Sequence, residues 1–344
     1  MNRILFSTLL IIPMLFLFSL KENDPEDEKV QFFVPQGWPA PHYDFSKNPL
    51  TKTGIHLGRK LFYDEKLSRD STISCASCHL SYTGFTHIDH LLSHGIEGRI
   101  GYRNTQTIVN PAWQKTFMWD GSINHLDMQP LAPLQNESEM DNSLENIITY
   151  LKSSSEYRTL FAKVFQTEDP ITVTNMQKSM SQFMLQFNSY NSKYDQVMRG
   201  EKGAKFTKKE EQGLEVFRNQ CESCHKEPLF TDFSYRNNGL SVIPKLQDYG
   251  RYTVTGQSED SLMFKVPSLR NVEVTFPYMH DGRYLTLDMA IHHYDYYIED
   301  NPTLSKEIKS IHLTEKDKKS LMAFLKTLTD KSFLRNRALA YPRK

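Results

Sequence analysis

The chain has 344 residues, and its 41 Lys and Arg side chains balance its 41 Asp and Glu side chains, so its formal net charge is zero. A protein without a global basic field is not expected to bind nucleic acid, and a partner must be recognised by a local surface patch. The length is too great for one small domain and suits two domains of ordinary size, so an internal duplication is expected.

The N-terminal segment has the pattern of an export signal. Residues 4–20 form an apolar run after Arg3, interrupted only by Pro13 and small hydroxyl residues. Such a run is typical of a secretory signal peptide and predicts a periplasmic protein. An uncleaved membrane anchor stays open as the alternative, because the run is long for a signal core and no clear small-x-small cleavage site follows Leu20. Residues 1–20 are therefore assigned to a signal peptide or membrane anchor.

Residues 21–45 are expected to form a tether followed by an N-terminal arm. The stretch from Lys21 to Lys29 is acidic and poor in apolar groups, so it should bury nothing. Aromatic residues among prolines follow, which favours an extended arm that packs aromatic rings onto a domain surface. The aromatic residues of this arm are Phe32, Phe33, Trp38 and Tyr43.

Helical periodicity dominates the rest of the chain, and strand-like alternation is sparse. Apolar residues at i, i+3, i+4 and i+7 predict two amphipathic helices. A methionine-rich stripe from Met176 to Phe187 is expected to pack in a core rather than to bind a metal. The two amphipathic patterns are Leu144, Ile147, Ile148, Leu151 and Leu321, Phe324, Leu325, Leu328.

A further helix should lead directly into the second cysteine pair. Thr207 and Glu210 form a capping box that opens a helix through Leu214 and Phe217. The charged, glycine-containing stretch 193–209 before it is the expected junction between two halves. We therefore predict an all-α protein.

An internal repeat supports the duplication. Asp120-Gly121 is followed by Leu126-Asp127-Met128, and Asp281-Gly282 is followed at the same spacing by Leu287-Asp288-Met289. An Arg-Asn pair lies upstream of each turn, at Arg103-Asn104 and at Arg270-Asn271. We assign the two halves to residues 46–195 and 205–335.

All four cysteines lie in two C-x-x-C-H motifs, the signal for covalent haem attachment. Two thiols at this spacing can form thioethers to the two vinyl groups of one haem, and the adjacent imidazole then binds the iron. The alternatives are two disulfides, a zinc site or a thioredoxin-like pair. The zinc alternative fails on spacing, and the thioredoxin alternative explains neither the duplication nor the histidines. The motifs are Cys75, Cys78 and His79, and Cys221, Cys224 and His225, with the two histidines as proximal iron ligands.

Longer motifs resemble those of the bacterial diheme cytochrome c peroxidases, the group that includes the MauG-type enzymes. The resemblance covers roughly residues 34–328. It is carried by Phe264-Lys265-Val266-Pro267-Ser268-Leu269-Arg270-Asn271, by Pro277-Tyr278-Met279-His280-Asp281-Gly282, by Leu57-Gly58-Arg59-Lys60-Leu61-Phe62 and by Trp119-Asp120-Gly121.

The resemblance implies two cytochrome c-like domains, each with one covalently bound c-type haem. It implies that hydrogen peroxide is reduced at the first, peroxidatic haem, with electrons relayed through the second haem from a small cytochrome c or a cupredoxin. It is also compatible with a homodimer. Two alternatives stay open, a MauG-type oxidase that acts on a protein or small molecule, and a diheme electron carrier without enzymatic activity.

The resemblance also implies roles for three residues near the first haem. Glu139 matches the family's acid-base glutamate, although an exposed loop carboxylate is the plain alternative. Trp119 aligns with the tryptophan between the haems, although ordinary packing would also explain it. His94 resembles the histidine that closes the peroxide site in the resting state, although a surface histidine would be unremarkable in a segment that also holds His87 and His90.

The distal ligand of the second haem departs from the peroxidase pattern. Cytochrome-oxidising members usually have a methionine where this chain has Tyr294, and tyrosine resembles the MauG-type enzymes. A phenolate would stabilise oxidised iron and lower the reduction potential. Met279 and Met289 stay open as alternative ligands, and Tyr294 could simply pack.

The family binds a calcium ion between its domains. Asn104, Thr275 and Pro277 match its ligands, and oxygen donors of this kind suit calcium. A capped turn at Asn104 is the alternative.

Overall fold

The computed structural model describes residues 27–342. The export signal predicted for residues 1–20 lies outside this range. Among the described residues, no helix is both long and apolar enough to cross a membrane.

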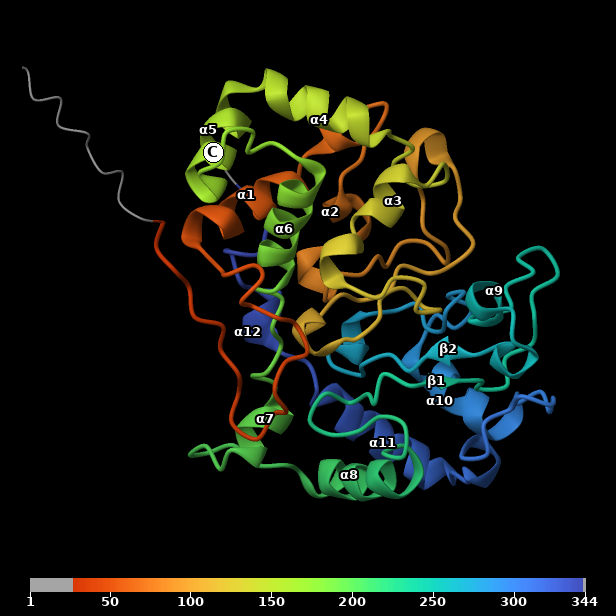
Figure 1. Cartoon of the computed structure of the whole chain (residues 1–344). Coiled ribbons are helices and arrows are strands. Elements are labelled where there is room, and N and C mark those ends of the chain that lie inside the picture. The colour runs from red at the N-terminus through yellow and green to blue at the C-terminus, as the bar shows by residue number, and fades with distance from the viewer. Residues whose placement is uncertain (1–26, 343–344) are drawn as a thin grey trace, which may run out of the picture.

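The described part of the chain is mainly helical, as predicted, with one two-stranded antiparallel sheet (Figure 1). The strands are β1 (Tyr235–Arg236) and β2 (Phe264–Lys265), with Tyr235 opposite Lys265. Eight short 3₁₀ turns connect the elements of this part. The α-helices are α1 (Lys52–Phe62), α2 (Cys75–Cys78), α3 (Leu131–Gln135), α4 (Leu144–Ser153), α5 (Ser155–Phe165), α6 (Val173–Met184), α7 (Lys193–Met198), α8 (Lys208–Gln220), α9 (Tyr252–Thr255), α10 (Leu287–Tyr296), α11 (Glu315–Lys326) and α12 (Lys331–Leu334).

The helices expected from periodicity form where their patterns lie. Leu144 to Leu151 fall within α4, and the Thr207–Glu210 capping box opens α8. The methionine stripe lies in α6 as far as Met184, and Phe187 packs from the residues that follow. Its methionines are buried in a hydrophobic core, as expected for packing. Helix α11 ends at Lys326, so Leu328 packs from the turn that follows rather than from the helix.

The buried apolar residues form two separate clusters. One gathers α1, α4, α5 and α6 around Phe62 and Phe183, and the other gathers α8 and α11 around Phe217 and Phe324. The C-terminal segment returns to the first cluster, where Phe333 of α12 packs and Arg59 of α1 donates to the carbonyl of Ala340 at 3.0 Å. The sequence pattern did not indicate this return.

Two glycines show that the helix pairs of the two clusters are built alike. A Cβ atom at Gly58 of α1 would collide with the carbonyl of Ser179 in α6, and one at Gly213 of α8 would collide with the carbonyl of Ser320 in α11. Each glycine therefore lets two helix backbones approach closely. Figure 1 shows α8 and α11 side by side below the first pair.

The turns around Asp120-Gly121 and Asp281-Gly282 also share one backbone geometry. Phe117 pairs with Ile123, and Tyr278 pairs with Tyr284, in equivalent antiparallel bridges. Met118 and Met279, which precede the glycines at the same spacing, have φ of 68° and 75°. These values lie in the left-handed region, which non-glycine residues seldom adopt.

The structure corrects the pairing of Asn104 with Asn271. The counterpart of Asn271 is Asn110, because each lies eleven residues before its turn glycine and each has a left-handed backbone. Their amides also donate to equivalent carbonyls, those of Phe187 and Leu328. The Arg-Asn match in the sequence was therefore a local coincidence. Asn104 has no counterpart at the same structural position in the second half.

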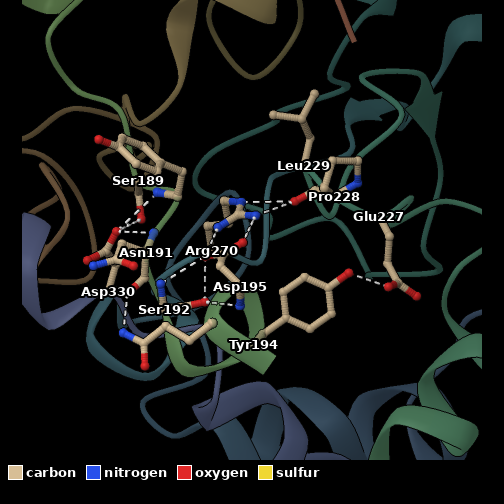
Figure 2. Close-up of polar contacts among 12 residues, drawn as sticks. Ser189, Asn191, Ser192, Tyr194, Asp195, Glu227, Pro228, Leu229, Arg270 and Asp330 are labelled. Atoms are coloured by element: carbon tan, nitrogen blue, oxygen red, sulfur yellow. Dashed lines mark hydrogen bonds and ion pairs between the residues drawn. The ribbon is translucent and has the colours of Figure 1, made fainter. Parts of the chain in front are cut away.

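The junction between the clusters is fixed by a buried ion pair. Arg270 donates to both carboxylate oxygens of Asp195 in α7, at 2.9 and 2.8 Å, and also to the carbonyl of Pro228. Asp330 accepts hydrogen bonds from the backbone amides of Tyr190 and Asn191 just before α7. Figure 2 shows these contacts side by side.

The N-terminal arm packs as expected, but the predicted tether does not stay free over its whole length. Trp38 lies edge-on to Trp113, with ring centroids 4.9 Å apart. Asp27, inside the predicted tether, accepts a hydrogen bond from the amide of Thr53 at 3.1 Å. The first amides of α1 lack helical partners, so a carboxylate there is favourable.

Candidate haem sites

The first cysteine motif presents a thiol pair and an oriented imidazole. Cys75 and Cys78 bound α2, and the amide of His79 closes the turn on the carbonyl of Cys75 at 2.9 Å. His79 Nδ1 lies 2.8 Å from the carbonyl of Phe85. With Nδ1 protonated for this bond, Nε2 keeps the lone pair that a metal needs.

The second motif repeats this arrangement after α8. The amide of His225 bonds the carbonyl of Cys221 at 3.0 Å, and Nδ1 lies 3.1 Å from the carbonyls of both Phe230 and Pro267. Burial lowers the pKa of His79 and of His225, which favours the neutral, ligating imidazole.

The four cysteines are free thiols, so the disulfide alternative is not what the structure shows. Burial raises the pKa of Cys75 and of Cys221 to about 12 and that of Cys78 to about 11. Neutral thiols are poor zinc ligands and poor disulfide-exchange nucleophiles. The C-x-x-C-H spacing of the two thiols and the imidazole suits covalent haem attachment instead.

A large cavity beside the second motif has a lining that suits a haem. Its volume is about 210 Å³, and Cys221, Cys224 and His225 line it. This is more than ten times the space that a single water needs, at roughly 10–15 Å³. Most of the surrounding side chains are apolar, among them Val272 and Leu325. A thiol pair, a neutral imidazole and apolar walls are the environment that a c-type haem requires.

Two candidate distal ligands reach this cavity, and one does not. Tyr294 of α10 and Met279 of the Asp281-Gly282 turn both line it. Met289 is 43% exposed and does not line it, so the structure gives no support to Met289 as a ligand. Burial raises the pKa of Tyr294 to about 12, and a hydrogen bond with the side chain of Asn238 opposes that shift. A phenolate at Tyr294 would therefore need a bound cation to stabilise it.

Glu139 lies close to the thiols of the first motif. Its carboxylate interacts electrostatically with both Cys75 and Cys78, and Asn136 donates to its Oε1 at 2.9 Å. Burial raises the pKa of Glu139, and the bond from Asn136 only partly offsets this. A carboxyl group with one oxygen held and a raised pKa suits proton transfer better than an exposed loop carboxylate would.

His94 belongs to a row of three imidazoles. Its carbonyl lies 3.5 Å from the sulfur of Cys78, but its ring packs on His90, with centroids 3.9 Å apart. His90 Nδ1 lies 3.2 Å from Nε2 of the buried His87. Iron ligation by His94 stays a prediction, and the row itself was not expected from the sequence.

Trp119 lies at the candidate haem site of the second motif. It lines the cavity of the second motif, and its indole N–H donates to the carbonyl of Asn104 at 2.9 Å. Thr86, next to the Phe85 that holds His79, lines the same cavity. The ring therefore lies at the candidate haem site of the second motif, and its position between two haems stays a prediction.

The three residues matched to a calcium site lie around the cavity of the second motif. Asn104, Thr275 and Pro277 all line the same cavity. Asn104 uses its side-chain N–H to bond the carbonyl of Leu91 at 2.9 Å, which leaves its amide oxygen as an acceptor. Across residues 27–342, no group of three or more His, Cys, Asp or Glu side chains is arranged to hold a metal ion. Calcium binding here stays a prediction.

Two residues at the sites were missed by the sequence analysis. Asn238 contacts the candidate ligands of the second site, but it lies in a loop with no motif. Lys265 is buried, donates to the carbonyl of Thr116 at 2.7 Å, and holds the carbonyl of Trp119 through its amide. Its place in the Phe264–Asn271 motif was the available signal. Burial lowers the pKa of Lys265 to about 7.

Known proteins resemble this chain over most of its length. Residues 52–203 match a family model described as di-haem cytochrome c peroxidase. A methylamine utilization protein MauG from Methylorubrum extorquens is 31% identical, over 87% of this chain and 84% of its own length. A cytochrome c551 peroxidase from Nitrosomonas europaea is 33% identical, over 79% of each chain. A crystal structure of a MauG-like protein associated with microbial copper homeostasis superposes with a TM-score of 0.83 at 31% identity, covering 91% of this chain and 99% of that one.

Proposed function

This chain belongs to the family of di-haem cytochrome c peroxidases, and we propose that it is an exported enzyme that reduces hydrogen peroxide to water. His79 and His225 would each hold one haem, the first supplying the site of peroxide reduction and the second the route by which electrons arrive. The reaction consumes two electrons and two protons for each peroxide and releases two waters. Two c-type haems are covalently attached, through Cys75 and Cys78 and through Cys221 and Cys224.

The observation that carries this proposal is the position of Glu139 beside the first thiol pair. The haem at His79, when bound, supplies the iron at which the O–O bond breaks. Glu139 would accept a proton from one oxygen of the peroxide and return it to the other, departing oxygen. Asn136 fixes Oε1, so Oε2 is the atom that exchanges the proton. The raised pKa of Glu139 suits both steps, because the group must take up a proton and release it within one turnover.

Electron supply involves Trp119 and a partner protein. The indole lies against the cavity of the second motif, where an oxidisable ring can shorten electron transfer between the haems. The donor is a small cytochrome c or a cupredoxin, recognised by a local surface patch because the chain has no net charge. Export to the periplasm rests on the apolar run at residues 4–20. A calcium ion held by Asn104, Thr275 and Pro277 would stabilise the region between the haems.

A second function is favoured by Tyr294. A tyrosinate ligand would lower the potential of the His225 haem, which would make that haem a poor acceptor of electrons from a cytochrome. The chain would then act as a MauG-type oxidase, in which peroxide-derived oxidising power is passed to a protein or small-molecule substrate. The similarity to proteins named MauG agrees with this alternative.

Steady-state kinetics separate these functions. A cytochrome c peroxidase should turn over reduced cytochrome c continuously when peroxide is added. A MauG-type oxidase should consume peroxide but oxidise the cytochrome only slowly. A diheme electron carrier should be inert toward peroxide, and that result would contradict both enzymatic proposals.

A further inference from the structure

The cavity beside His225 holds two side chains that could bind iron, and one amide contacts both. Tyr294 and Met279 line the cavity from different elements, α10 and the Asp281-Gly282 turn. Asn238 Nδ2 donates to Met279 Sδ at 3.4 Å, and the same side chain hydrogen-bonds the phenol of Tyr294. Asn238 itself lines the cavity. A single side-chain amide therefore lies between the two alternative ligands.

The position of Asn238 is fixed from α10. Its carbonyl lies 2.8 Å from Nε2 of His293, which is fully buried and adjacent to Tyr294 in sequence. The preceding residue, Asn237, bonds Asn301 and Thr303 through its side chain, each at 2.8 Å. These contacts fix the backbone of Asn238 relative to α10, the helix that carries Tyr294.

We propose that Asn238 is the positioning residue that selects the distal ligand of the second haem, directing the Tyr294 oxygen to the metal while retaining the Met279 sulfur. This inference rests on the proposed ligation of the His225 haem and extends it to a residue that makes no bond to iron.

The chemistry of the two acceptors explains the direction of the selection. A primary amide has two N–H groups, so it can serve both partners at once. A thioether sulfur is a weak acceptor. A hydrogen bond to Sδ draws electron density from the sulfur and holds the Met279 side chain toward Asn238, so it disfavours binding of the sulfur to a metal. A phenolate oxygen carries a negative charge and is a strong acceptor, so it can accept a hydrogen bond while it binds a metal. The same amide therefore supports the oxygen ligand and restrains the sulfur ligand.

Met279 is well placed to replace the tyrosine if the restraint is lost. Its backbone is held in the left-handed region by the turn, where the amide of Gly282 bonds its carbonyl at 3.2 Å. A change of ligand would therefore have to come from rotation of the Met279 side chain, with the backbone unchanged.

The test uses the full-length protein with both haems attached, and its readouts are the absorption spectrum and a redox titration. Asn238→Leu removes both N–H groups at similar volume. We expect the second haem to gain the charge-transfer absorption of His/Met ligation and its potential to shift upward. Asn238→Gln, which keeps an amide, should restore most of the original spectrum. Asn238→Leu combined with Met279→Leu should abolish the new absorption, while Met279→Leu alone should leave the spectrum unchanged.

Two results would overturn the selection. One is an Asn238→Leu protein that keeps the original spectrum and potential, and the other is a variant that loses its distal ligand without acquiring methionine. Tyr294→Phe tests the underlying ligation separately. If Tyr294→Phe leaves the spectrum and potential of the second haem unchanged, Tyr294 is not its ligand. This conclusion does not depend on any Asn238 variant.

Discussion

Arg270 and Asp195 form a two-bond ion pair in which the arginine side chain has no exposed surface and the aspartate side chain only 4%. Burial opposes ionisation of Asp195, but the guanidinium overrides it and lowers the carboxyl pKa. Arg270 also packs over the ring of Trp38, at 4.5 Å from its centroid. The pair therefore joins the second-half motif, α7 and the N-terminal arm at one buried point.

Asp195→Asn should destabilise the protein by about 3–5 kcal/mol, because it leaves a buried guanidinium without its counter-charge. Glu201→Gln is the matched control, since its pair with Arg199 is exposed and worth about 1 kcal/mol or less. Denaturant unfolding of both variants measures the difference. Equal losses for the two would show that the buried pair has no special role.

Two haems should be covalently bound to each chain. Acid-acetone extraction should leave the colour with the protein, because each C-x-x-C-H motif forms two thioethers. Intact mass should show the chain plus two haems. Cys75→Ala and Cys221→Ala should each weaken one attachment only, and a mass with a single haem in the unmodified protein would contradict the prediction.

Glu139→Gln should slow the reaction with peroxide by roughly a hundredfold or more while both haems stay attached, as expected for loss of a general acid-base. Stopped-flow mixing with peroxide gives the rate. Glu137→Gln, a neighbouring exposed carboxylate, is the control and should react normally. In the unmodified protein the rate should fall as the pH drops through a pKa above the usual range for glutamate, because burial raises the pKa of Glu139 and its carboxylate must accept the first proton. An unchanged rate in Glu139→Gln would remove this residue from the mechanism.

Tyr294→Met should raise the potential of the second haem and introduce the absorption typical of His/Met cytochromes. Replacing an anionic oxygen by a neutral sulfur stabilises the reduced iron. Tyr297→Met is the control, because Tyr297 is 64% exposed just beyond the same helix. Redox titration of both variants is the measurement. If Tyr294→Met behaves like Tyr297→Met, Tyr294 only packs, and Met279 becomes the ligand to test.

The stability of the folded protein should decrease in mild acid because His280 is buried. Burial lowers the pKa of His280 to about 4, although Asp281 and Asp248 partly offset this. The neutral ring therefore contributes stability that is present above the unfolded pKa of about 6.5 and is lost as the pH falls toward 4. The loss is at most about 3 kcal/mol. Unfolding of His280→Gln at pH 7 and pH 5 should show a smaller pH dependence than the unmodified chain, and an equal dependence would refute this role.

The features that the sequence determined are local ones. The two thiols and the imidazole of each C-x-x-C-H motif lie within five residues, so backbone geometry alone places them together. The periodic patterns of α4, α6 and α8 predicted helices for the same reason, because side chains at helical spacing share a face whatever surrounds them. Even the Asp120-Gly121 and Asp281-Gly282 repeat was visible, since each turn closes over a few residues.

The identity of the residues around the second haem was decided by the tertiary structure. Met289 and Tyr294 lie on the same helix, about 140° apart around its axis. Only the packing of α10 determines that Tyr294, and not Met289, faces the cavity. In the sequence, either Asn104 or Asn110 could be the counterpart of Asn271. Only the structure distinguishes them, because the backbone amide of Asn104 bonds the carbonyl of His280 and that of Asn110 bonds the carbonyl of Phe187.

Asn238 shows the limit most clearly. It belongs to no motif, and its neighbours Met279 and Tyr294 lie more than forty residues away along the chain. Chain connectivity fixes contacts within a turn or a helix, whereas contacts between distant segments depend on how two helices and a loop pack together. The sequence therefore determined the two candidate haem attachment motifs, and the packing of α10 against the loop around Asn238 determined which side chains line the cavity beside the second motif.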